Sequence, residues 1–274
     1  MIRSLLYVPA HSERFLAKAH ERGADAIILD LEDAVPAEHK SAARDALPLS
    51  VTAVRRGGAQ VFVRINPGFG RAADAVAACR AGADAIYVPK VSGPEELVEL
   101  DALLAPVERE LGRDSMRFVA LLEDPAAVLN ARAIAAAPRL LALSTGGEDL
   151  ALALRATPTP EVLRFPKLLV HYAAKAQGLL SFGLLRSTAD YSDLDAIAAA
   201  VVEAREHGFD GATCVHPSLV PLLNGGFSPT PEELNWAHRV ITRAEGEPGP
   251  FALDGRMVDA PVIARARNLL RRGG

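Results

Sequence analysis

The sequence predicts an α/β fold: a closed (β/α)8 barrel of the TIM type with a C-terminal helical extension. The chain has 274 residues, a length that one such barrel commonly uses. Eight short apolar runs alternate with alanine-rich segments of helical character, which indicates a parallel sheet. No GxGxxG follows the first run, which disfavours an open dinucleotide-binding sheet.

Most of the predicted strands are rich in Val, Ile or Leu, as strands buried on both faces should be. Between them lie segments with charges on one face, such as Glu38–Arg56 and Asp193–His207. The sequence Gly-Ala-Asp-Ala occurs at Gly23–Ala26 and at Gly82–Ala85, where a helix ends with Gly and a strand begins. The predicted strands are Ser4–Pro9, Ala26–Leu31, Gln60–Ile65, Ala85–Val91, Arg117–Leu122, Leu140–Ser144, Leu179–Leu185 and Ala212–Val215.

The last part of the chain departs from this alternation. Pro229–Glu245 is predicted to form one more helix, followed by a Gly/Pro-rich stretch, Gly246–Pro250, and a final segment, Phe251–Arg272. Residues 1–274 are therefore expected to form a single domain. Residues 229–274 would be an extension that packs on the barrel or on a neighbouring subunit.

Composition excludes several classes of protein. The net charge of −4 argues against a nucleic-acid partner, which would need a basic face. Cys79 and Cys214 are far apart and form no CxxC pair, so neither a disulfide scaffold nor a thiolate zinc site is expected. No apolar run approaches a membrane span, and Met1–Arg3 leads directly into a strand without a signal peptide. We therefore expect a cytoplasmic protein with no membrane partner.

Acidic residues follow several predicted strands, at the end of a barrel where active sites lie. Converging carboxylates repel one another unless a cation lies between them, and hard oxygen ligands favour Mg²⁺, with Mn²⁺ as second choice. Arg64, after the third strand, suits bidentate capture of a substrate carboxylate. Gly146 and Gly147 could let backbone N–H groups approach an anion. The acids are Asp30, Glu32, Asp33, Glu123, Asp124, Glu148 and Asp149.

Each acid also has a purely structural interpretation. Asp33, Asp124 and Glu148 precede helix-like segments and could be helix N-caps. Asp30 and Glu32 are expected to point to opposite sides of the strand, so that one of them faces helices or a salt bridge.

Six sequence elements, whose order and spacing cover nearly the whole chain, form a recognisable set. They are Arg3–Pro9, Gly23–Val35 with Lys40 and Arg44, Val63–Asn66, Val88–Lys90, Gly208–Gly211 with His216 and Pro217, and Leu253–Pro261. "DLEDAV" within the second is a specific motif, and the last resembles a DGxMVDaP ending. The set resembles the citrate lyase β-subunit-like proteins of the HpcH/HpaI aldolase superfamily, which include malyl-CoA and citramalyl-CoA lyases.

The resemblance implies a magnesium-dependent barrel that acts on a 2-oxo or 2-hydroxy acid and a CoA thioester. It implies that Glu123 and Asp149 are metal ligands and that Glu123 also contacts the substrate. Arg64 and the backbone near Gly146 would bind the substrate carboxylate. It further implies that Glu32 or Asp33 orients metal-bound water. Asp259 would be the acid/base, donated by a neighbouring subunit of a homotrimer or a dimer of trimers. The same Asp259 could instead cap a helix that starts near Pro261.

The sequence departs from this family pattern at four positions. Asp124 replaces the usual Thr after Glu123, Gly183 lies where an Asp is common, Ala212 replaces a Lys, and Leu219 replaces a Gln. These changes put the identity of the substrate in question, whereas the expected metal and carboxylate positions are intact.

The expected reaction is a reversible Claisen-type cleavage of a malyl-CoA-like or citramalyl-CoA-like 2-hydroxyacyl-CoA, giving an acyl-CoA and a 2-oxo acid. One alternative is a metal-dependent aldolase that uses a free aldehyde without CoA and does not need Asp259. Another is a non-catalytic barrel that serves as a subunit of a complex. Binding of a CoA thioester by the isolated protein separates these possibilities.

Overall fold

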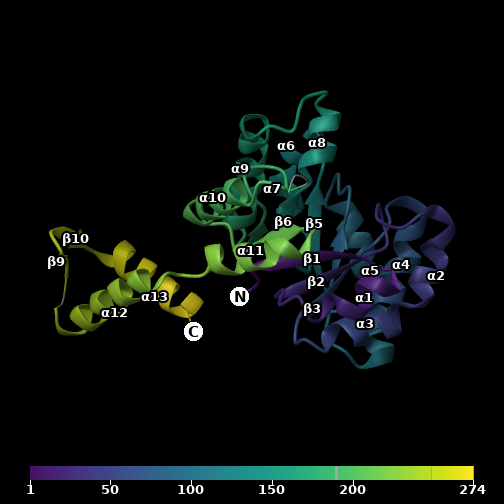
Figure 1. The fold of residues 1–274 in the computed structure, drawn as a ribbon, viewed down its shortest axis with the longest axis horizontal. Helices are drawn as coiled ribbons and strands as arrows, with labels where there is room; N and C mark the ends of the chain where they lie inside the picture. Colours follow the sequence, from purple (N-terminus) through teal and green to yellow (C-terminus); the bar gives the residue numbers. More distant parts are fainter. Residues whose placement is uncertain (189–190, 248, 274) are drawn as a thin grey trace.

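The computed structural model describes residues 1–188, 191–247 and 249–273 of the chain (Figure 1). Eight strands form one parallel sheet: β1 (Ser4–Pro9), β2 (Ala26–Asp30), β3 (Gln60–Arg64), β4 (Ala85–Val88), β5 (Arg117–Leu122), β6 (Leu140–Thr145), β7 (Leu180–Phe182) and β8 (Ala212–Cys214).

Helices follow the strands and surround the sheet, which gives the alternation that the sequence predicts. They are α1 (Glu13–Ala19), α2 (Lys40–Asp45), α3 (Leu47–Arg55), α4 (Arg71–Arg80), α5 (Glu95–Leu111), α6 (Pro125–Leu129), α7 (Ala131–Ala135), α8 (Gly147–Ala153), α9 (Pro160–Ala176), α10 (Leu194–Glu206) and α11 (Val220–Phe227). Short 3₁₀ turns lie at η1 (Ala37–His39), η2 (Gly68–Gly70) and η3 (Pro217–Leu219).

The sheet closes into a barrel. Its order is β7-β6-β5-β4-β3-β2-β1-β8, so each strand pairs with its neighbours in sequence and β1 also pairs with β8. A parallel bridge between Phe182 and Gly211, with the Gly183 N–H donating to the Gly211 carbonyl at 2.9 Å, joins the β7 edge to the β8 edge. A Cβ at Gly211 would lie 2.2 Å from the Ile2 carbonyl oxygen, so the closure requires glycine there. The (β/α)8 prediction is confirmed.

Both faces of the strands are buried, and successive residues point to different layers. Ile28 and Phe62 belong to the apolar cluster inside the barrel, whereas Ile27 and Leu29 belong to the larger cluster between the strands and the helices. This double burial explains why the strands appear in the sequence as nearly continuous apolar runs.

The predicted helix Glu38–Arg56 is divided in the structure. It consists of η1, α2 and α3, and α3 begins at Leu47 with Pro48 in its first turn. Proline lacks an N–H donor and suits a first helical turn, so Pro48 starts a new helix instead of continuing the old one.

The C-terminal extension consists of α12 (Pro231–Gly246), an antiparallel hairpin of β9 (Phe251–Leu253) and β10 (Arg256–Val258), and α13 (Ala260–Gly273). It has its own small apolar cluster, and Figure 1 shows it projecting from one side of the barrel. Ion pairs Arg205–Glu233 at 2.5 Å and Arg272–Asp210 at 2.9 Å connect it to the barrel. The extension is therefore joined to the barrel by polar contacts rather than by the main core.

The hairpin was not predicted from the sequence. Asp254 and Gly255 form its turn with φ values of 51° and 74°, and an Asp-Gly pair with positive φ at both residues is a favoured two-residue hairpin turn. This Asp-Gly turn signal was present in the sequence of Phe251–Arg272.

No helix in the described part of the chain is both long and apolar enough to cross a membrane.

Candidate active site

A cavity of about 470 Å³ opens at the carboxyl ends of the barrel strands. Most of the residues that the sequence singled out line it, namely Asp30, Asp33, Arg64, Glu123, Gly146, Gly147, Glu148, Asp149 and Gly183. Glu32 does not line the cavity itself but contacts Arg64, which does. The structure thus brings most of the predicted site residues together at the expected end of the barrel.

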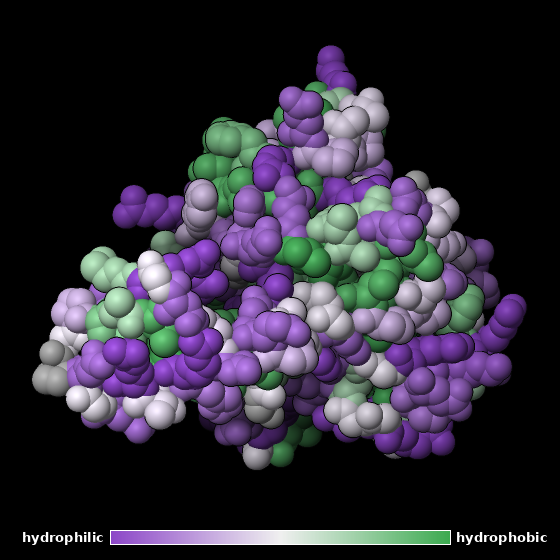
Figure 2. All heavy atoms as spheres, turned by 60° about the vertical axis from the view of Figure 1, so that its left-hand side comes forward, coloured by the Kyte–Doolittle hydropathy of each residue, from purple (hydrophilic) through white to green (hydrophobic). Residues whose placement is uncertain are grey.

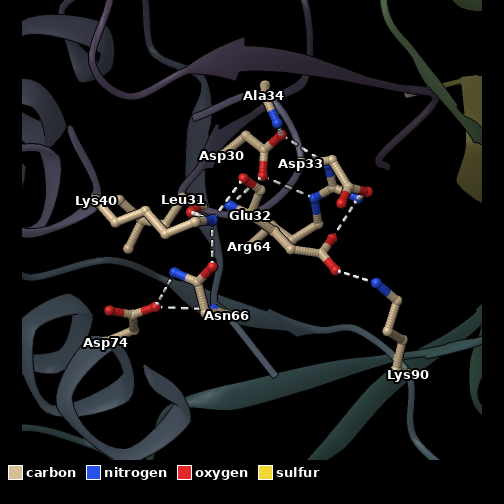
Figure 3. Close-up of polar contacts among 10 residues, drawn as sticks. All are labelled: Asp30, Leu31, Glu32, Asp33, Ala34, Lys40, Arg64, Asn66, Asp74 and Lys90. Atoms are coloured by element: carbon tan, nitrogen blue, oxygen red, sulfur yellow. Dashed lines mark hydrogen bonds and ion pairs between the residues drawn. The ribbon is translucent and has the colours of Figure 1, made fainter. Parts of the chain in front are cut away.

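Arg64 lies at the centre of an acidic network (Figure 3). Its Nε and Nη2 donate to the two carboxylate oxygens of Asp30 at 2.8 and 2.6 Å. Its Nη1 lies 2.8 Å from Oε2 of Glu32, an ion pair without hydrogen-bond geometry, and 3.4 Å from Asp33. Its guanidinium also lies 4.8 Å from the centre of the Tyr7 ring. Asp30 therefore occupies one full edge of the guanidinium, and the hydrogen bonds to Asp30 are the main reason why the pKa of Arg64 rises despite burial.

Asp30 and Glu32 do not point to opposite sides, in contrast to the prediction. β2 ends at Asp30, and the backbone then turns, so that the N–H groups of Glu32 and Ala34 donate to the Asp30 carboxylate at 2.9 and 3.2 Å. Both acids are buried and both contact Arg64. The prediction of opposite directions was wrong, because residues two apart in a strand share a face, and alternation itself therefore places both acids on one side.

Two lysines hold the turn after β2. The Lys40 Nζ donates to the carbonyls of Leu31 and Glu32 at 2.9 and 2.8 Å and to Asn66 at 2.5 Å. The Lys90 Nζ donates to Oε1 of Glu32 at 2.9 Å. Figure 3 shows these contacts on either side of Glu32. Burial raises the pKa of Glu32 in spite of the nearby Arg64 and Lys90, which lower it.

Glu123 is buried at the end of β5 without a complete set of partners. Its Oε2 has no hydrogen-bond donor among the described residues. Burial, and next the negative charge of Asp149, raise the pKa of Glu123 to about 8. Gly146 lies directly against it, since a Cβ at Gly146 would be 2.7 Å from the Glu123 Cγ. A side chain at position 146 would displace the carboxylate.

Glu123 and Asp149 are the pair most suited to a divalent cation. Among the described residues, no group of three or more His, Cys, Asp or Glu side chains forms a ready-made metal cluster. Mg²⁺, however, is commonly held by one or two carboxylates, with water and substrate completing its shell. The orphaned Oε2 and the mutual repulsion of the two acids fit such an ion.

The N-cap interpretation holds for one of the three acids for which it was considered. Asp124 accepts a hydrogen bond from the Ala127 N–H at 2.9 Å and caps α6. Asp33 caps no helix and has 58% of its side chain exposed beside the cavity. Glu148 lies inside the first turn of α8 and accepts a hydrogen bond from the Ser187 hydroxyl at 2.5 Å.

The four departures from the family pattern occupy different environments. Gly183 lines the cavity, with a φ of 157°. Ala212 and Leu219 are buried in the core, and Asp124 is the helix cap described above. Only Gly183, of these four, lines the cavity.

Sequence reasoning missed Lys167 of α9. Only 5% of the residue is exposed, and its Nζ donates to the carbonyls of Leu184 and Arg186 at 2.9 and 3.0 Å beside the cavity. Burial lowers its pKa to about 8. The available signal was its spacing, because Leu163, Lys167, Val170 and Ala174 share the buried face of α9.

Asp259 lies in the extension between β10 and α13. Its Oδ1 accepts a hydrogen bond from the Val262 N–H at 3.3 Å, so the helix-cap interpretation is confirmed. Among the described residues, those that line the cavity end at Val215, so the chain does not bring its own Asp259 to Glu123. Of the two apolar residues that precede Asp259, Val258 is buried and Met257 is 69% exposed.

Comparisons with known proteins agree with this geometry. The family model described as HpcH/HpaI aldolase/citrate lyase matches residues 3–217. The (3S)-malyl-CoA thioesterase of Cereibacter sphaeroides is 37% identical over 278 residues, covering 98% of this chain and 93% of that protein. The citrate lyase subunit beta of Haemophilus influenzae is 32% identical over 282 residues, covering 98% and 96%.

A solved structure extends the likeness to three dimensions. CitE from Mycobacterium tuberculosis, in complex with magnesium, acetoacetate and coenzyme A, superposes with a TM-score of 0.80 at 30% identity. The match covers 99% of this chain and 97% of that one. With the family model matched along most of the barrel and relatives above 30% identity along nearly the whole length, this chain belongs to the HpcH/HpaI aldolase/citrate lyase family.

Proposed function

We propose that the protein is a magnesium-dependent carbon–carbon lyase that cleaves a 2-hydroxyacyl-CoA, of the malyl-CoA or citramalyl-CoA type, reversibly into an acyl-CoA and a 2-oxo acid. The observation that carries the proposal is the pair formed by the buried Glu123 and the half-buried Asp149, which share one cavity with Arg64. The M. tuberculosis relative binds magnesium and coenzyme A, which supports Mg²⁺ and a CoA thioester as the ligands proposed for this protein.

Glu123 and Asp149 would hold Mg²⁺, and Arg64 would orient the substrate carboxylate. When bound, Mg²⁺ would polarise the 2-oxygen of the substrate. Because Asp30 occupies the Nε edge of Arg64, the substrate would meet the remaining N–H groups of the guanidinium. The backbone at Gly146 would complete the carboxylate site, and Glu32 and Asp33 would orient water at the rim. Lys40 and Lys90 keep the turn that carries these two acids in place.

In the condensation direction, Asp259 would remove a proton from the α-carbon of the acyl-CoA. That carbon then bonds to the 2-carbon of the oxo acid, and the 2-oxygen takes a proton to become the hydroxyl. Cleavage is the reverse, in which Asp259 returns a proton to the α-carbon. General acid–base groups of this kind contribute roughly 10²–10⁴ in rate.

Asp259 would act in the cavity of a neighbouring subunit, in a homotrimer or a dimer of trimers. Within one chain it caps α13 in the projecting extension and lines no part of the cavity. The surface also carries exposed apolar side chains, with Leu152 of α8 75% exposed and Phe165 of α9 69% exposed. Figure 2 shows hydrophobic residues grouped on the upper part of the face in view. Contact between copies would cover such residues.

Hydrolysis of the thioester is a second candidate, because the 37% identical relative is a (3S)-malyl-CoA thioesterase. It would use the same substrate class and would release free CoA from the 2-hydroxyacyl-CoA. The two activities give different products, so one experiment distinguishes them.

The test is a mass-spectrometric screen of the isolated protein with Mg²⁺, acetyl-CoA or propionyl-CoA, and glyoxylate, pyruvate or oxaloacetate. We expect a new CoA ester whose mass is the sum of the two reactants, lost on chelation and in Glu123→Gln. Glu206→Gln, an exposed site on α10, is the matched control and should retain activity. Free CoA with a free 2-hydroxy acid would indicate hydrolysis.

Two further outcomes would contradict the proposal. Condensation of a free aldehyde with pyruvate, without any CoA ester product, would identify an aldolase. No turnover together with no binding of a CoA thioester would identify a subunit that functions only in a complex.

A further inference from the structure

A further cavity, of about 1260 Å³, lies between the barrel and the C-terminal extension, and we call it the junction cavity. Its barrel wall includes residues 178–180 at the start of β7 and Asp210 before β8, so it lies at the end of the barrel opposite the active site. Its other wall is α13, whose carboxyl end faces the barrel (Figure 1). Five cations and three acids line it: Lys175, Arg205, Arg265, Arg271 and Arg272, and Glu206, Asp210 and Glu233.

Asp210 is shared between two of these cations. The Lys175 ammonium, from α9 of the barrel, and the Arg272 guanidinium, from α13, both pair with its carboxylate, the latter at 2.9 Å. Arg265 and Asn268 lie seven and four residues before Arg272, so the three share the face of α13 that borders the cavity. One carboxylate therefore faces one cation from the barrel and one from the extension.

Glu233 of α12 is surrounded in the same way. Burial would raise its pKa, but the hydrogen bond from Arg205 of α10, at 2.5 Å, and the charges of Arg205 and Arg265 lower it. The Arg265 guanidinium also lies 5.3 Å from the centre of the Trp236 ring. Among the described residues, neither the Arg265 guanidinium nor the Nε of Arg205 has a hydrogen-bond acceptor. The cations of the junction cavity thus outnumber its acids, and some of their donors have no acceptor in the protein.

We propose that the junction cavity binds a small multivalent anion of the phosphate class. Guanidinium groups present planar forks of donors that suit phosphate oxygens, and Lys175 adds a compact charge. Such an anion contacts the barrel and α13 at once and reinforces the polar contacts that join them. Because Asp259 caps α13, an anion that holds α13 against the barrel also fixes the position of Asp259. The site therefore goes beyond the proposed active site and binds an effector rather than a substrate.

Calorimetry with inorganic diphosphate tests the site, in buffer of constant ionic strength without Mg²⁺, which diphosphate would chelate. We expect one diphosphate to bind per chain. Arg265→Gln should weaken its affinity about tenfold or more, because a hydrogen bond between charged groups is lost. Arg267→Gln is the matched control, since it makes the same change on the same helix at an exposed position outside the cavity. It should leave the affinity unchanged.

Lys175→Gln repeats the test from the barrel side and should give a similar loss, so the result does not depend on how α13 tolerates a substitution. Adenosine diphosphate is the second probe and distinguishes two sources of the same chemistry. Binding tighter than that of diphosphate would identify a nucleotide as the natural ligand, and weaker binding would identify a free anion.

Other results would overturn the proposal. These are no binding of diphosphate, or an equal loss in Arg265→Gln and Arg267→Gln, which would reflect only the net positive charge of α13. A loss in Arg186→Gln would place the anion in the active-site cavity, which Arg186 lines. Unchanged diphosphate affinity in Arg265→Gln, together with an altered sedimentation coefficient, would show that the junction cavity receives a second copy of the chain. None of these results affects the lyase proposal, which concerns the other end of the barrel.

Discussion

Asp30 binds Arg64 through both carboxylate oxygens, at 2.8 and 2.6 Å, where β2 and β3 end side by side. The arrangement leaves Arg64 rigid and largely neutralised before any substrate arrives. The Asp30 carboxylate also accepts hydrogen bonds from two backbone N–H groups of the turn after β2. Asp30 therefore links the position of Arg64 to that of Glu32. The contact gives Arg64 a structural role in addition to the binding role proposed for it.

Replacing Arg64 with lysine should therefore have two effects. A lysine keeps the charge but loses the planar fork, so Asp30 and Glu32 would lose part of their pairing. We expect affinity for the 2-oxo acid to fall at least tenfold by calorimetry and the melting temperature to fall as well. Arg55→Lys, at a surface pair with Asp84, is the control and should alter neither quantity. Unchanged affinity in Arg64→Lys would count against carboxylate capture.

The metal assignment predicts a loss of ligand binding without a loss of fold. Glu123→Gln and Asp149→Asn each remove one negative charge from the pair while preserving shape. Both variants should lose Mg²⁺-dependent binding of a 2-oxo acid in calorimetry and keep the circular dichroism of the unaltered protein. Normal binding in both would exclude these residues from the metal site.

Asp124 offers the opposite prediction, because it caps α6 directly beside Glu123. Asp124→Ala should lower the free energy of unfolding by about 1 kcal/mol, measured by urea denaturation. Affinity for Mg²⁺ and for the 2-oxo acid should stay within about twofold. A large loss of affinity with no loss of stability would show that Asp124 belongs to the site and not only to the helix.

Lys167 predicts a pH dependence of stability. Its pKa is about 8 in the folded protein and near 10.5 when exposed, so the folded state binds fewer protons between these values. Above about pH 10.5 the lysine is neutral in both states, so its burial costs no deprotonation. As the pH falls from 10.5 to 8, the unfolded state takes up the proton first and the free energy of unfolding decreases. Lys167→Met removes the linkage. The stability of the variant relative to the unaltered protein should fall as pH rises from 8 to 10, by at most about 1.4 kcal/mol per pH unit.

Chemical denaturation at four or five pH values across this range measures the difference. Lys18→Met, on α1, serves as the control because its side chain is exposed. A constant difference between Lys167→Met and the unaltered protein across the range would mean that Lys167 is not desolvated in solution.

The barrel could be predicted because strands buried on both faces leave continuous apolar runs, and eight such runs alternate with helices. Arg64, Glu123 and Asp149 could be placed together because parallel strands end at one edge. The common side of Asp30 and Glu32 was also within reach of the sequence, because residues two apart in a strand share a face, and both acids contact Arg64. Lys167 was missed because a charged residue in a helix usually marks the solvent face, whereas here backbone carbonyls satisfy it in the interior.

The function of Asp124 was ambiguous for a different physical reason. An aspartate directly after a strand and before a helix has the same sequence signature whether it binds a metal or caps the helix. Only the hydrogen bond from Ala127 decides between them. The same ambiguity affects Asp259, whose hydrogen bond with Val262 establishes a cap but does not exclude a second role.

That second role gives the last prediction, which concerns sharing of a site between subunits. If Asp259 serves a neighbour's cavity, Asp259→Ala and Glu123→Ala are each inactive for different reasons. A mixed oligomer would contain some cavities in which an intact Glu123 faces an intact Asp259 from another chain. Co-expression of the two variants with different affinity tags, followed by tandem purification, should therefore restore a measurable fraction of activity. Mixed oligomers of verified composition with no activity above either parent would show that no such exchange occurs, and Asp259 would then be a helix cap alone.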